Sequence, residues 1–244
     1  QFTTLFGDDK ERHMCSDISH QRIIFIDWHG VISTTPFWAS IISSITHPLR
    51  EQLKDKLSNV FSHTTYIHNW MRGVISSEDV INDLGIRMDR RFRSDFLARR
   101  LLADCARMNV DTDLLEALMM VARQVPIVLA TDNMDCFAQV ISSARAKLNT
   151  RHPRKPELQD WASMFADVIC SSNIGTLKAE DTHAFFNNVL SSRGLRFTDA
   201  LLIDDRADNC EAFRCCGGNA LQWKTGLNSV SEAAERTRFW INAQ

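Results

Sequence analysis

Five short apolar segments along the chain have the pattern of strands that are buried on both faces. In the first, residues 23–26 are all Ile or Phe, and Asp27 follows directly. A run without polar alternation is typical of a strand in a parallel sheet, because helices cover both faces of such a sheet. The pattern predicts strands over residues 23–27, 126–130, 166–170, 200–204 and 219–223.

Segments with helical spacing separate the last four of these predicted strands. Strands that alternate with helices form a parallel sheet with right-handed crossovers. The pattern therefore predicts an α/β fold, with a Rossmann-like, doubly wound parallel sheet at its core.

The interval after the first predicted strand is helical, and it is much longer than one crossover needs. Roughly a hundred residues separate Asp27 from Thr131, whereas most connections in compact domains are far shorter. Two stripes of apolar residues recur at helical spacing within it. The first stripe is Leu49, Leu53, Leu57 and Phe61, and the second is Leu97, Leu101, Cys105 and Met108.

Capping signals support the same interpretation. Ser76 and Asp79 resemble a capping box, and Gly85 is a suitable stop for the helix between them. Asp111 is placed to cap a further helix that leads into the second strand. We therefore predict an α/β core domain over residues 21–35 and 111–244, an inserted helical cap domain over 36–110, and an N-terminal extension over 1–20.

Charge and cysteine content restrict the classes of partner and compartment. The 28 basic and 30 acidic residues give a net charge of -2, which offers no attraction to nucleic acid or to an acidic membrane surface. The longest apolar stretches are about six residues, too short to span a bilayer, and the first twenty residues lack a signal-peptide pattern. The seven cysteines have no CxxC spacing, so we expect free thiols and a cytoplasmic protein. No apolar stripe is clear enough to predict a dimer.

Polar side chains follow the first four predicted strands, where each strand ends. In a doubly wound sheet these ends converge on one crevice. Clustered carboxylates repel one another and hold protons unless a cation neutralises them, and Mg²⁺ prefers such oxygen ligands. The side chains at these positions belong to Asp27, Thr131, Asn133, Lys178, Asp204, Asp205 and Asn209.

At these positions the sequence resembles the haloacid dehalogenase-like hydrolase superfamily. The resemblance covers about residues 21–35 and 111–225, and the helical insert stands in the place of that family's helical cap. The residues that match the four motifs are, in order, Asp27 as the nucleophile, Thr131, Lys178, and the acidic pair Asp204 and Asp205 with Asn209 downstream.

The resemblance implies Mg²⁺-dependent hydrolysis of a small phosphorylated molecule. In the family's phosphatases the first aspartate attacks phosphorus, so Asp27 is expected to form an aspartyl-phosphate. Thr131 and Lys178 are expected to hold the phosphoryl oxygens, as catalytic and substrate-binding groups. We add Asn133 as a substrate-binding residue and interpret its neighbour Asp132 as a turn residue.

The resemblance also implies the ligands of the metal ion. Mg²⁺ is expected to bind the carboxylates of Asp27, Asp204 and Asp205 and the backbone carbonyl of His29. Phosphoryl transfer needs alignment and charge neutralisation above all, and this arrangement supplies both.

His29 departs from the family pattern, because the phosphatases have an acid/base aspartate at this position. One interpretation is that His29 does the same work, since an imidazole donates and accepts protons near neutral pH. A second is that the site cleaves a carbon–halogen or carbon–phosphorus bond. A third is a weak or inactive site in a binding protein. We predict the first, with His29 as the catalytic acid/base.

The second interpretation has specific requirements in the family. The dehalogenases need no metal, and they resemble this chain poorly where Asp204 and Asp205 stand. A phosphonate hydrolase has a similar Asp-Trp-X-Gly motif, but it forms a Schiff base with a cap lysine. Lys54 and Lys56 lie in the predicted cap, and we interpret both as solvated helix residues.

Overall fold

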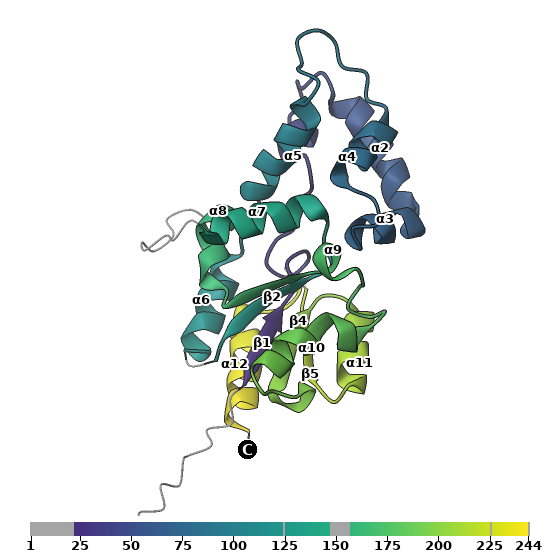
Figure 1. Ribbon diagram of the computed structural model, residues 1–244. Helices are drawn as coiled ribbons and strands as arrows, with labels where there is room; N and C mark the ends of the chain where they lie inside the picture. Colours follow the sequence, from purple (N-terminus) through teal and green to yellow (C-terminus); the bar gives the residue numbers. More distant parts are fainter. Residues whose placement is uncertain (1–21, 124, 147–156, 225, 244) are drawn as a thin grey trace, which may run out of the picture.

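The structure, a computed structural model, describes residues 22–123, 125–146, 157–224 and 226–243 (Figure 1). The N-terminal extension predicted for residues 1–20 lies outside the described residues. None of the described helices is long and apolar enough to cross a membrane.

A parallel sheet of five strands forms the centre of the molecule, in the order β3-β2-β1-β4-β5. The chain therefore extends from β1 in both directions along the sheet, which confirms the predicted doubly wound α/β fold. Each strand begins and ends within one residue of its predicted limits. The strands are β1 (Ile23–Ile26), β2 (Ile127–Thr131), β3 (Asp167–Cys170), β4 (Ala200–Asp204) and β5 (Asn219–Gln222).

The apolar run of β1 is explained by its place at the centre of the sheet. Its side chains alternate between two faces, and all four are fully buried. Ile23 and Phe25 lie in one apolar cluster, where the Phe25 ring lies 4.8 Å from that of Phe186. Ile24 and Ile26 lie in the larger cluster on the opposite face. A polar side chain anywhere in this strand would lose its hydration without a partner.

Helices cover both faces of the sheet, as Figure 1 shows. One cluster contains residues of α6 (Thr112–Val121), α7 (Asp135–Ala146) and α12 (Val230–Asn242). The other contains residues of α10 (Thr182–Ser192) and α11 (Ala207–Cys215). The shorter elements are α8 (Leu158–Trp161), η1 (Ala162–Met164), α9 (Ser171–Ile174) and η2 (Phe197–Asp199).

Further helices occupy the interval between β1 and α6, and they lie beyond the carboxyl ends of the strands (Figure 1). The predicted capping box is confirmed: Ser76 and Asp79 bond reciprocally, and Gly85 ends the helix in the left-handed conformation. The helices are α1 (Ala39–Ile42), α2 (Arg50–Ser62), α3 (Thr64–Met71), α4 (Ser77–Leu84) and α5 (Phe96–Ala106).

Polar contacts fix these helices relative to the sheet. The Asp135 carboxylate, at the start of α7, accepts hydrogen bonds from the Ser77 backbone N–H at 3.0 Å and from the Trp70 indole at 3.1 Å. Arg72, after α3, forms an ion pair with Glu180. These contacts hold α3 and α4 beside the ends of the strands.

A close backbone approach strengthens this attachment. The Ser171 hydroxyl donates to the backbone carbonyl of Met71 at 2.7 Å. Gly73 has a positive φ of 70°, and a Cβ there would lie 2.5 Å from the Ser172 carbonyl oxygen. Only glycine fits this position without displacing the backbone of α9.

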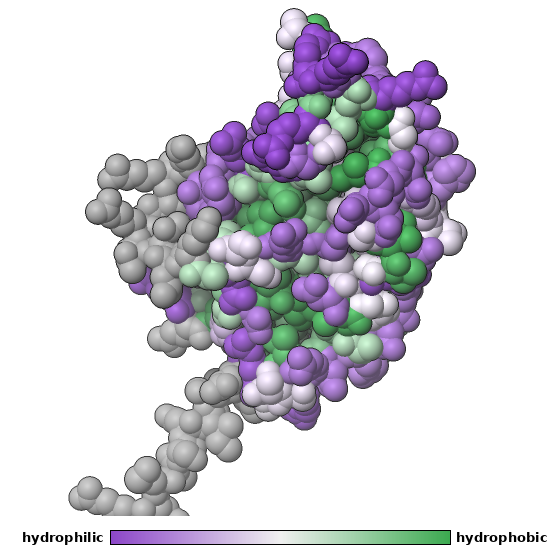
Figure 2. All heavy atoms as spheres, turned by 45° about the horizontal axis from the view of Figure 1, so that its top comes forward, coloured by the Kyte–Doolittle hydropathy of each residue, from purple (hydrophilic) through white to green (hydrophobic). Residues whose placement is uncertain are grey.

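The first predicted helical stripe departs from expectation at its last residue. Leu49, Leu53 and Leu57 are buried, but the Phe61 side chain is 46% exposed. The last turn of α2 extends past the packed contact, so Phe61 faces a cavity instead of the core. Figure 2 shows that hydrophobic side chains reach the surface between hydrophilic ones on one face of the molecule.

Candidate active site

A buried ammonium group joins the ends of two strands. Lys178 Nζ lies 3.0 Å from the Asp27 carboxylate, which follows β1, and 2.5 Å from the Asp204 carboxylate, the last residue of β4. It also donates to the Ala130 carbonyl of β2 at 3.1 Å. Only 1% of the Lys178 side chain is exposed, and the neighbouring carboxylates keep its pKa above the ordinary value against the effect of burial.

Hydrogen bonds to the charged form fix the orientation of Asp204. The Asn209 side-chain amide donates to both carboxylate oxygens, each at 3.1 Å. The backbone N–H of Arg206 donates to the same carboxylate at 2.9 Å. Asn209 lies on the first turn of α11, so the start of this helix faces the strand end. Asp204 is therefore rigidly placed before any ligand binds.

Three carboxylates form a group that suits a divalent cation. Asp27, Asp204 and Asp205 each place an oxygen within 4.8 Å of the others. Burial raises the pKa of Asp27 to about 7, with Lys178 opposing the shift and Asp204 adding to it. Burial likewise raises the pKa of Asp205. One ammonium cannot neutralise three carboxylates, and the all-oxygen donor set fits Mg²⁺.

Gly30 leaves room for one member of this group. Its φ is 84°, and a Cβ at this position would lie 2.4 Å from the Asp205 carboxylate oxygen. The missing side chain allows Asp205 to pack directly against the backbone that follows β1. Gly30, three residues after Asp27, thus brings the segment after β1 into contact with the acidic pair at the end of β4.

The hydroxyl of Thr131 is buried at the end of β2 without a hydrogen-bond partner among the described residues. A buried hydroxyl without a partner costs about 1–3 kcal/mol of stability. Beside a charged cluster, such a hydroxyl is suited to donate to an oxygen of a ligand, as a phosphoryl group offers. Asp27 Oδ1, in contrast, is held by its ion pair with Lys178.

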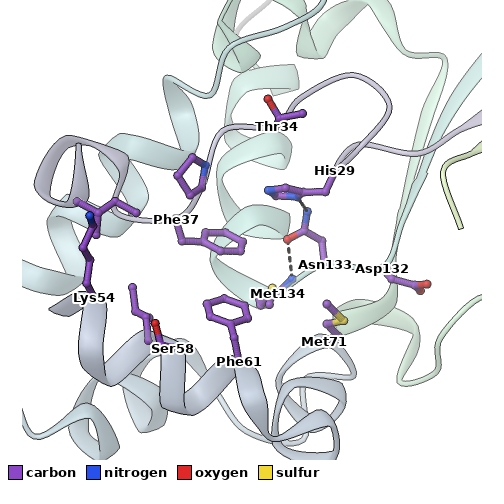
Figure 3. A pocket seen from close by; sticks show the side chains of 13 residues that line it. His29, Thr34, Phe37, Lys54, Ser58, Phe61, Met71, Asp132, Asn133 and Met134 are labelled. Carbon is purple, nitrogen blue, oxygen red and sulfur yellow. Dashed lines mark hydrogen bonds between the residues drawn. The ribbon is translucent and has the colours of Figure 1, made fainter. Parts of the chain in front are cut away.

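His29 belongs to a second group of side chains beside this cluster (Figure 3). The Asn133 side-chain amide donates to Nδ1 at 3.3 Å, while Nε2 lies 3.2 Å from the Thr35 carbonyl oxygen. The backbone N–H of Met134 donates to Asn133 Oδ1 at 2.9 Å, which turns the amide nitrogen towards the imidazole. This network assigns the proton of the neutral ring to Nε2. Burial lowers the pKa of His29, which favours the neutral form.

Asp132 is more than the turn residue that the sequence suggested. Its carboxylate accepts from the backbone N–H of Lys178 at 3.0 Å and lies 3.5 Å from the Asn209 amide nitrogen. Burial raises its pKa. Asp132 thereby positions two residues of the charged cluster. An acidic residue directly after Thr131 at a strand end was the signal that could have identified it.

The sequence matches no family model and no curated protein. A HAD family enzyme from Bacteroides thetaiotaomicron, in complex with magnesium and inorganic phosphate, superposes with a TM-score of 0.58 and 16% identity over 85% of this chain and 96% of that one. A predicted HAD-like family hydrolase from Porphyromonas gingivalis superposes with a TM-score of 0.57. The two sequences are 16% identical over 90% of this chain and 98% of that one. The chain has the haloacid dehalogenase-like fold. The L-2-haloacid dehalogenase from Xanthobacter autotrophicus, with chloropropionic acid covalently bound, has a similar fold. Its TM-score is 0.52, with 11% identity over 82% of this chain and 76% of that one.

Within this haloacid dehalogenase-like fold, the predicted site residues form two neighbouring groups. Asp27, Lys178, Asp204 and Asp205 meet in the charged cluster. His29 and Asn133 bond to each other and line the adjacent cavity. Thr131 lies buried at the end of β2, the strand that pairs with β1.

We expect Thr131→Val to raise the free energy of unfolding by about 1 kcal/mol, because it replaces an unpartnered buried hydroxyl with a methyl group of similar size. Urea denaturation measures the change. Thr182→Val is the matched control: the Thr182 hydroxyl donates to the Lys178 carbonyl at 2.8 Å, so the same substitution should destabilise there. A loss of stability at position 131 would show that this hydroxyl has a partner in the protein.

Proposed function

We propose that this protein is a Mg²⁺-dependent phosphatase that releases phosphate from a small phosphorylated molecule. The observation that carries the proposal is the buried Asp27 carboxylate, 3.0 Å from Lys178 and grouped with Asp204 and Asp205. A structural neighbour in complex with magnesium and inorganic phosphate supports the same chemistry. With 16% sequence identity, this likeness supports a shared fold alone, and the activity is our inference from the site.

Asp27 is the proposed nucleophile. Its carboxylate oxygen attacks phosphorus, the bond from phosphorus to the leaving oxygen breaks, and an aspartyl-phosphate forms. Lys178 and Thr131 are placed to donate hydrogen bonds to the phosphoryl oxygens, and Asn133 to contact the substrate. In a second step, water attacks phosphorus and restores the Asp27 carboxylate.

Asp27, Asp204, Asp205 and the backbone carbonyl of His29 are the proposed ligands of Mg²⁺. The bound ion supplies charge neutralisation, both for the clustered carboxylates and for the phosphoryl oxygens. Asn209 and the Arg206 backbone N–H keep Asp204 in place for this role. Lys178 provides the remaining positive charge beside the nucleophile.

His29 is the proposed acid/base. It would donate a proton to the leaving oxygen in the first step and accept one from water in the second. The negative charge of a bound phosphate would favour the protonated ring before the first step. Asn133 donates to Nδ1 of the neutral ring and would position that form, so this amide must turn away when Nδ1 takes up the proton.

We further propose that residues 36–110 act as a cap over the strand ends. Side chains from α2 and α3 line a cavity together with side chains that follow β2. Movement of this segment would admit substrate and then exclude water. The bonds of Asp135 and Glu180 described above would hold the closed position.

Replacement of the nucleophile tests the proposal directly. We expect Asp27→Asn to lower kcat for 4-nitrophenyl phosphate by a factor of about 10³ or more in the presence of Mg²⁺, because an amide is a poor nucleophile. Asp55→Asn, on the exposed face of α2, is the control and should keep full activity. Unchanged turnover in Asp27→Asn would contradict the proposal.

Gly30→Ala tests the metal ligands. The added methyl group would displace the Asp205 carboxylate, so we expect Mg²⁺ affinity measured by isothermal titration calorimetry to fall by about tenfold to a hundredfold. Gly194→Ala carries the same backbone strain, with a φ of 65° and no atom within 4 Å of the new Cβ, and should leave affinity unchanged. Equal effects of the two changes would exclude Asp205 as a ligand.

The dependence on leaving group tests His29. If His29 protonates the leaving oxygen, His29→Ala should lower kcat for an alkyl phosphate by about 10²–10⁴, and much less for 4-nitrophenyl phosphate, whose leaving group needs no proton. Glycerol phosphate and 4-nitrophenyl phosphate provide the two rates. Equal losses on both substrates would assign His29 a positioning role.

A further inference from the structure

A cavity of about 520 Å³ opens beside the charged cluster. Its wall combines the segment after β1, the inner faces of α2 and α3, and the residues that follow β2. The volume is in the range of sites that enclose a small organic molecule. A phosphoryl group alone would leave most of it empty, so the cavity is suited to the rest of a substrate.

The middle of the cavity is apolar. The rings of Phe37 and Phe61 face each other across it, with Met71 and Met134 nearby (Figure 3). Phe61 is 46% exposed although the rest of its helical stripe is buried, and a large apolar side chain turned into a cavity is typical of a binding site. Few hydrogen-bonding side chains occur in this part of the wall. These features favour an aromatic ring over a sugar, whose hydroxyl groups would each need a partner.

The two ends of the cavity differ in charge. At one end Asp132, His29 and Asn133 adjoin the charged cluster, where the phosphoryl group is proposed to bind. Figure 3 places Lys54, from α2, on the opposite side, beyond the two phenylalanine rings. No ion pair involves Lys54 among the described residues. Its ammonium is thus available to a ligand that extends across the apolar part.

We propose that the substrate is a phosphate monoester of an aromatic compound with a second anionic group, such as a carboxylate, at the end remote from the phosphate. The ring would lie between Phe37 and Phe61, and the second anion would pair with Lys54. Both helix lysines are exposed, as the sequence predicted, but Lys54 also lines the cavity whereas Lys56 does not. This proposal rests on the phosphatase function proposed above.

The test compares two substrates that differ only in charge at the far end. They are 3-(4-phosphonooxyphenyl)propanoate and its carboxamide. We expect the wild-type protein to prefer the carboxylate about fivefold in kcat/KM, the size of effect that a partly exposed ion pair gives. The preference should disappear in Lys54→Gln, persist in Lys54→Arg and reverse in Lys54→Glu.

Two further variants serve as controls. Lys56→Gln should keep the wild-type preference, because Lys56 lies on the same helix outside the cavity. Phe61→Ala should raise KM for both aryl substrates about tenfold and leave that for acetyl phosphate, which has no ring, unchanged. A uniform change for all three substrates would overturn the assignment of the ring site.

The outcomes separate this proposal from the general one. Turnover of both aryl phosphates at equal kcat/KM in the wild type would overturn the role of Lys54 and leave the phosphatase function intact. If 4-nitrophenyl phosphate is hydrolysed and neither ester is, the present proposal is overturned and the phosphatase function stands. If none of the three is hydrolysed, the phosphatase function fails, and calorimetric binding of the two compounds decides the present proposal. Tighter binding of the carboxylate, lost in Lys54→Gln, would support it, and equal binding would overturn it.

Discussion

The candidate active site depends on one buried ammonium group, that of Lys178, and on the ion pairs that it forms. It touches the carboxylates of Asp27 and Asp204 and a carbonyl of β2, so it joins three adjacent strands at their carboxyl ends. Two more carboxylates, Asp132 and Asp205, lie around it. The excess of negative charge in a buried place is unfavourable for a folded protein, and a divalent cation would offset it.

The fold makes this concentration of charge possible. β1 is entirely apolar and lies between β2 and β4, so its end places Asp27 between the other strand ends. Lys178 lies in the turn between α9 and α10, and Asn209 lies in the first turn of α11. The helices beyond the strand ends add the walls of a cavity. Core and helical insert thus contribute different parts of one site: charge from the first and apolar surface from the second.

Much of this was predictable from local patterns in the sequence. Apolar runs predicted β1, β2 and β4, because burial on both faces excludes polar residues. β5, at the edge of the sheet, is less buried than predicted and carries exposed Asn219 and Gln222. The capping residues of α4 predicted its limits. The contacts of Asp132 were not recognised. They depend on two distant segments, which carry Lys178 and Asn209. The pairing of His29 with Asn133 was missed for the same reason, since it joins the ends of β1 and β2.

Covalent trapping tests the central claim, that Asp27 carries the phosphoryl group. Sodium borohydride reduces an acyl phosphate to an alcohol, so treatment during turnover of 4-nitrophenyl phosphate with Mg²⁺ should convert Asp27 to homoserine. Peptide mass spectrometry identifies the position. The account predicts conversion at residue 27 alone, dependent on both substrate and metal. Phosphate release without conversion, or conversion at Asp132, Asp204 or Asp205, would contradict it.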